Sequence, residues 1–99
     1  MKSEWQIHMD FEKAMRAVDK LRQIARNMND NASNLGTTMT SIDTSWDGEN
    51  SDNYLVKGKS VQGKVGQTAG DIDRVAKVVE EIAIRTRDAE LAAIRLAED

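Results

Sequence analysis

The chain has 99 residues and a mass of 11.0 kDa, which allows one domain at most. Its net charge of −3 and pI near 5.1 argue against a nucleic-acid-binding protein, which usually carries a basic stripe. It has no cysteine, which excludes disulfides and thiolate chemistry, and no proline, a residue that interrupts helices. We therefore expect a single all-α domain over residues 1–99, with no nucleic-acid partner.

The residues before the first predicted helix carry little functional signal. They lack the apolar segment of a signal peptide, so we expect none, and no apolar run in the chain is long enough to cross a bilayer. Trp5 and Ile7 either hold this segment against the helices or belong to a disordered arm. His8 is the only histidine, and a metal site needs several ligands. We interpret His8 as a surface residue and expect no metal site.

The first helix is predicted from about residue 10 to residue 43, with Asp10 as its N-cap. Apolar residues recur there at alternating steps of three and four, the spacing of a coiled-coil seam, meaning the apolar column through which a helix packs. Residues 27–36 are mostly poor helix formers, so either packing overrides their propensity or the helix is broken there. The predicted seam comprises Phe11, Ala14, Val18, Leu21, Ala25, Met28, Ala32, Leu35, Met39, Ile42 and Trp46.

The second helix is predicted over residues 50–97, with a weaker repeat of the same spacing. The steps along its seam are Tyr54, Gly58, Val61, Val65, Thr68, Ile72, Val75, Val79, Ile82, Thr86, Ala89, Ala93 and Leu96. Gly63, Gly66 and Gly70 fall on another face, where glycine costs a helix about 1 kcal/mol relative to alanine. These glycines indicate either a weak, solvated stretch or close approach by another backbone.

Two long helices joined by a tight turn form an antiparallel hairpin. Such a hairpin has one seam, so much of its apolar surface stays uncovered. A second hairpin would cover it and complete a four-helix bundle. We therefore expect a dimer, formed either by two copies or with a different chain.

The turn between the predicted helices contains Trp46-Asp47-Gly48. Gly48 can adopt the positive φ that a tight reversal often requires, and Trp46 continues the first seam. A Trp-x-Gly tripeptide near the middle of a chain of this length, between two amphipathic helices, resembles the WXG100 superfamily. These are small helical-hairpin proteins of bacterial type VII secretion systems. The resemblance covers essentially the whole chain.

The resemblance implies a paired four-helix-bundle substrate of that system, without catalysis, cofactor or small-molecule ligand of its own. Its partner would be a second copy or a helical chain such as the N-terminal domain of a type VII effector. Trp46 and Gly48 would contribute to a surface recognised by the export ATPase. The protein would be cytoplasmic before export and then secreted or held at the cell surface, without a cleaved signal peptide.

The chain departs from the family in its export signal, which is often Tyr-x-x-x-Asp/Glu just after the second helix. The only tyrosine here is Tyr54, and the nearest C-terminal substitute is Ile94 with Glu98. Either the signal is degenerate, or the partner chain carries it. We favour the second interpretation, because the glycine face suggests a surface built for a specific neighbour.

Two other patterns are set aside on spacing and context. Gly58-Lys59-Ser60 resembles the end of a phosphate-binding loop, but Asn53 stands where that loop needs glycine, and no strand precedes it. The charged residues from Glu80 to Glu90 suggest a solvated face with intrahelical ion pairs. The alternative function is a generic coiled-coil adaptor unrelated to secretion, in which Trp46-Asp47-Gly48 is coincidental.

Overall fold

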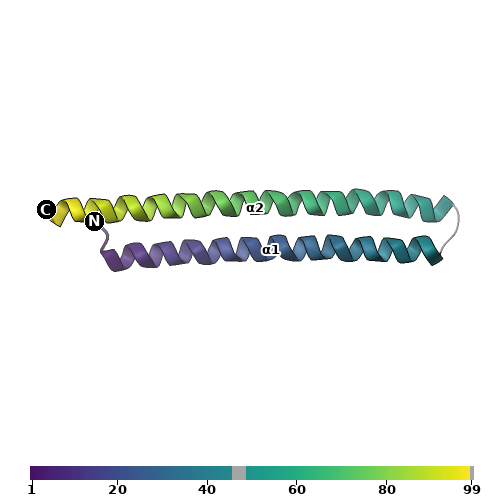
Figure 1. Ribbon diagram of the computed structural model, residues 1–99, viewed down its shortest axis with the longest axis horizontal. Coiled ribbons are helices and arrows are strands. Elements are labelled where there is room, and N and C mark those ends of the chain that lie inside the picture. The colour runs from purple at the N-terminus through teal and green to yellow at the C-terminus, as the bar shows by residue number, and fades with distance from the viewer. Residues whose placement is uncertain (46–48, 99) are drawn as a thin grey trace. The chain divides into compact units, whose positions relative to one another are not determined.

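The computed structural model describes residues 1–45 and 49–98, with side chains for residues 1–43 and 52–98. It contains two long helices, α1 (Glu4–Ser45, 42 residues) and α2 (Glu49–Glu98, 50 residues), and no strand within the described ranges (Figure 1). The all-helical prediction is confirmed. The predicted bounds were too narrow, above all at the start of α1, which lies six residues before Asp10.

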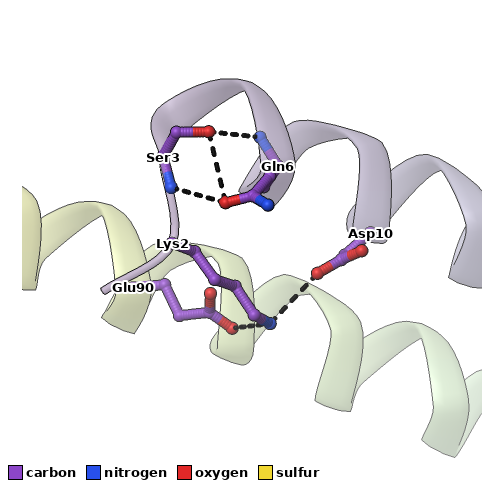
Figure 2. A network of polar contacts seen from close by, with 5 residues as sticks. All are labelled: Lys2, Ser3, Gln6, Asp10 and Glu90. Carbon is purple, nitrogen blue, oxygen red and sulfur yellow. Dashed lines mark hydrogen bonds and ion pairs between the residues drawn. The ribbon is translucent and has the colours of Figure 1, made fainter.

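The start of α1 is set by Ser3 and Gln6, which form a reciprocal capping box (Figure 2). The Gln6 backbone N–H donates to Ser3 Oγ at 3.2 Å, and the Ser3 backbone N–H donates to Gln6 Oε1 at 3.0 Å. The prediction of Asp10 as N-cap was therefore wrong, because these two side chains already satisfy free N–H groups about two turns earlier. Ile7, expected before the helix, is 2% exposed within it.

Replacing Ser3 by alanine tests this cap. We expect the change to lower the free energy of unfolding by about 1 kcal/mol, the usual cost of losing an N-cap side chain. Thermal unfolding followed by far-UV circular dichroism would measure the loss. Asp10→Ala gives the comparison: a larger loss there than at Ser3 would contradict the assignment of the cap.

The expected weak region of the first helix lies inside α1, which includes residues 27–36 without interruption. Threonine hydroxyls that follow it donate to carbonyls four residues earlier, from Thr37 to Ser33 at 3.3 Å and from Thr38 to Asn34 at 3.1 Å. Such bonds satisfy the hydroxyls within the helix. The runner-up expectation of a broken helix is therefore not met.

The chain divides into two compact units, each built from part of α1 and part of α2. The terminal unit comprises residues 1–22 and 73–99, and in Figure 1 it pairs the purple part of α1 with the yellow-green part of α2. Lys2, just before α1, bonds to Glu90 of α2, and Arg22, further along α1, bonds to Glu80, which is earlier in α2. The two segments are therefore antiparallel.

The central unit comprises residues 23–72. Its segments are also antiparallel, since Gly36 lies against Gln62 and Gly58 lies against Met39. Both glycines sit where the helices approach closely: a β-carbon at Gly58 would overlap the Met39 thioether, and one at Gly36 would lie 2.9 Å from Gln62 Nε2. Packing thus explains these two glycines, and Gly58 belongs to a helix contact and not to a phosphate loop.

The core of each unit is narrow and rich in alanine. Small side chains let two helices approach closely, so little side-chain volume is needed to fill the space between them. We call these buried residues the contact stripe. In the terminal unit the stripe contains Ile7, Val18, Ala76 and Ala83, and in the central unit it contains Ala25, Ala32, Met39 and Ala69.

Candidate partner-binding surface

On α2 the buried residues of the contact stripe each follow a predicted seam residue by one position. Ala83 is 9% exposed, whereas the neighbouring Ile82, which we assigned to the seam, is 55% exposed. Likewise, Ala76 is buried, whereas the neighbouring seam residue Val75 is exposed. Ile82 therefore does not belong to the contact with α1, because the smaller alanine allows the closer approach. Its place in a dimer seam stays a prediction.

The other predicted seam residues differ in burial. On α1, Val18, Ala25, Ala32 and Met39 are buried. On α2 most of the predicted seam is exposed, including Thr68 and Leu96. A third group of large apolar side chains is half-buried, so that part of each side chain is covered and part remains open. These half-buried residues are Phe11, Leu21, Met28, Leu35, Ile42, Val65, Ile72 and Val79.

An apolar groove opens along one side of the terminal unit. It has a volume of about 230 Å³, and its floor is formed by Ile7, Phe11 and Ala14 from α1 and by Val79, Ile82, Ala83 and Thr86 from α2. The Arg87 guanidinium lies over the Phe11 ring, 4.3 Å from its centroid, so this arginine helps join the helices and is not simply solvated. Ile82 thus faces an unfilled apolar space.

Three residues that line this groove, Lys2, Asp10 and Glu90, form a charged network. Figure 2 shows its contacts. Lys2 Nζ lies 3.0 Å from Asp10 Oδ2 and 3.2 Å from Glu90 Oε1, joining the start of α1 to α2. Hydrogen bonding to Asp10 and Glu90 raises the pKa of Lys2 above its ordinary value of 10.5. The stabilisation from this raised pKa is present below pH 10.5 and is lost as the pH rises through the higher value.

A second apolar groove lies on the central unit and has a volume of about 330 Å³. Tyr54 and Val61 are exposed on its α2 side and follow the same spacing as Val75 and Ile82. Lys57 stands at its edge. The lining residues are Leu35, Thr38, Met39, Ile42, Tyr54, Lys57, Gly58 and Val61. We call the grooved side of each unit its open face.

Each unit also carries charged side chains that do not line the grooves of the open face. In the terminal unit Arg22 Nη1 donates to Glu80 Oε2 at 3.1 Å, and its pKa is raised by that bond and by the charges of Asp19 and Asp73. In the central unit Asp43 and Lys59 line a groove of about 270 Å³ together with Met39 and Leu55.

Gly63 and Gly66 have open space around them. A β-carbon at either position would meet nothing within 4 Å, so α1 does not approach them closely. Gly70 is half-buried. Within the chain Gly63 and Gly66 are therefore not in close contact with α1, and their role toward a partner stays a prediction. The glycines that do permit close approach within the chain, Gly36 and Gly58, were not predicted to do so. For Gly58 the sequence did contain a sign of this contact, because Gly58 falls on the predicted seam.

Replacing Gly63 and Gly66 together by alanine should raise the free energy of unfolding by about 2 kcal/mol, because each glycine costs a helix about 1 kcal/mol relative to alanine. Urea unfolding followed by circular dichroism would measure the gain. Gly58→Ala should gain less, since Met39 must move. A double variant less stable than the wild type would show that these positions are not open.

Of the remaining residues that were predicted to have a functional role, those that the structure describes do not line either apolar groove. Trp46 and Gly48 lie outside the described residues. Ile94 is half-buried and Glu98 exposed, and both lie within α2 and not after it. His8 is an exposed residue of α1, 3.9 Å from Glu4 Oε1.

The described part of the chain offers no cluster of three or more metal-ligating side chains. Within the same residues, neither helix has a stretch apolar enough to cross a membrane. Comparisons with protein-family models, with curated proteins and with solved structures each returned no match.

Proposed function

We propose that the chain is a non-enzymatic substrate of a bacterial type VII secretion system. It acts as a helical partner or targeting factor for an exported effector, or is secreted as a homodimer. In either form its open faces are covered by further helices to complete a four-helix bundle. The export ATPase of the system is its second partner.

The observation that carries the proposal is a combination within one chain. Trp46-Asp47-Gly48 stands between α1 and α2 in the sequence, and each unit has an apolar groove. Exposed apolar residues at seven-residue spacing, such as Val75 and Ile82, suit packing against another helix. A chain built to stand alone would have little use for such residues.

A generic coiled-coil adaptor is the second candidate. It is favoured by the lack of a C-terminal tyrosine motif, since Ile94 and Glu98 occupy the nearest comparable spacing. An adaptor would use the same open faces for a partner but would stay inside the cell. Export therefore separates the two candidates.

The test follows the tagged full-length chain in the source organism, with the type VII ATPase intact or deleted. We expect the protein outside the cells only when the ATPase is present, while a cytoplasmic marker stays inside in both strains. Equal amounts outside both strains, or none outside either, would contradict the secretion role. Retention in both strains together with a co-purifying helical partner would favour the adaptor.

A further inference from the structure

From the charges along the edges of the open faces, we infer that the natural occupant is an amphipathic helical partner with acidic flanks and not a second copy of this chain. The inference rests on the proposed role as a helical partner and identifies the chemistry of that partner. It starts from the placement of basic residues in a chain whose net charge is negative.

In the terminal unit the open face is bordered by basic side chains on both helices. Lys13 and Lys20 stand seven residues apart on α1, and Lys13 follows the groove residue Asp10 by three positions. Arg85 follows the groove residue Ile82 by three positions on α2. Residues three, four and seven apart share a helix face, so we place these exposed cations on the groove side of their helices. Of the three, Arg85 also lies 3.9 Å from Glu81 within α2.

The central unit repeats this arrangement on α2. Lys57 lines the groove, and Lys64 follows it by seven residues. Asp71, the acidic residue at the next such position, already makes an interaction within the chain. On the terminal unit Asp10 is likewise held by Lys2. These two carboxylates are therefore already engaged within the chain.

Three other carboxylates of the terminal unit, those of Asp19, Asp73 and Glu80, act on Arg22, and Glu80 accepts its hydrogen bond. The two carboxylates at the groove, those of Asp10 and Glu90, are both held by Lys2.

Pairing the open faces of two copies would bring basic edges together. In the terminal unit these edges carry Lys13 and Lys20, and in the central unit they carry Lys57 and Lys64. Like charges facing each other across an interface are repulsive and select against that pairing. A partner with Asp or Glu beside its apolar strip would complement the same edges.

A helical protein suits the open faces better than an anionic membrane. Apolar residues recur at heptad spacing on both helices, and the grooves between the helices are concave, which fits the side chains of another helix. A membrane surface needs neither the register nor the concavity. Vesicle binding is therefore a contrary outcome of the test.

The test uses the full chain with two synthetic helical hairpins of equal length and equal leucine content. One hairpin has Glu beside its apolar strip and the other has Lys. We expect isothermal titration to give binding to the Glu hairpin that is at least about tenfold tighter than to the Lys hairpin, and weaker at high salt. Self-association, measured by sedimentation, should be weak at low salt.

Charge-reversed variants identify the edge that is used. Lys13→Glu with Lys20→Glu, and Lys57→Glu with Lys64→Glu, should each reverse or abolish the preference for the Glu hairpin. The matched control, Lys59→Glu with Lys77→Glu, makes the same change in net charge away from the open faces and should keep it. Circular dichroism checks that every variant remains helical.

Three results would overturn the inference. One is a tight homodimer at low salt that weakens as salt is added. Another is equal binding to the two hairpins, or loss of the preference in the control as well. The third is binding to phosphatidylglycerol vesicles as tight as to the Glu hairpin. None of them bears on ATPase-dependent export, so the proposed function stands or falls separately.

Discussion

Replacing Ala76 by glutamate should unfold the protein or leave it barely stable. Ala76 is 0% exposed in the contact stripe, where helices approach too closely to admit a longer side chain. An unpaired carboxylate there costs several kcal/mol, a large share of the roughly 5–15 kcal/mol that stabilises a typical domain. Alanine and glutamate are both good helix formers, so the loss would come from packing and charge burial.

Val75→Glu is the control for this prediction. Val75 is the adjacent residue but is 53% exposed, and we expect its replacement to change the free energy of unfolding by less than about 1 kcal/mol. Urea unfolding of both variants, followed by far-UV circular dichroism, makes the comparison. Similar losses in the two variants, or a greater loss at Val75, would contradict the register of the contact stripe.

Ile82→Glu should block export while leaving the chain helical. Its side chain is 55% exposed and faces the apolar groove of the terminal unit, so a partner helix would bury the new charge. Loss of a buried anchor at an interface typically costs about 2 kcal/mol or more, which is about thirtyfold in affinity. The amount of protein outside the cells, measured beside total protein, should fall accordingly.

Ile84 provides a matched control two residues away. It is also an isoleucine, is 37% exposed, and does not line the groove. We therefore expect Ile84→Glu to be exported like the wild type. If both variants are exported normally, the open face of the terminal unit is not used. If only Ile84→Glu fails, the partner covers the other side.

The start of α1 could have been predicted more closely than it was. Ser3 and Gln6 have the spacing of a capping box, and Ile7 extends the apolar steps back from Phe11. We placed the start at Asp10 because the regular seam was counted from Phe11. The error came from weighing periodicity above the local capping signal.

The glycines show where local pattern is insufficient. Gly58 and Gly63 are both helical glycines of α2, yet one lies against Met39 and the other is open. Their positions in the apolar pattern differ, since Gly58 falls on the predicted seam and Gly63 on another face, but packing decides which face of the helix contacts α1. A glycine inside a helix is therefore consistent with low helix propensity or with close helix packing, and only the tertiary structure shows which of the two applies.

The amino-acid sequence by itself determined that the chain forms two long amphipathic helices, since the spacing of apolar residues and the lack of proline require only local geometry. Tertiary structure alone decided which apolar column of α2 meets α1. Neighbouring columns, such as those of Ile82 and Ala83, are both apolar and both periodic, so spacing cannot rank them. Close approach selects the alanines, and the larger side chains remain on the open face.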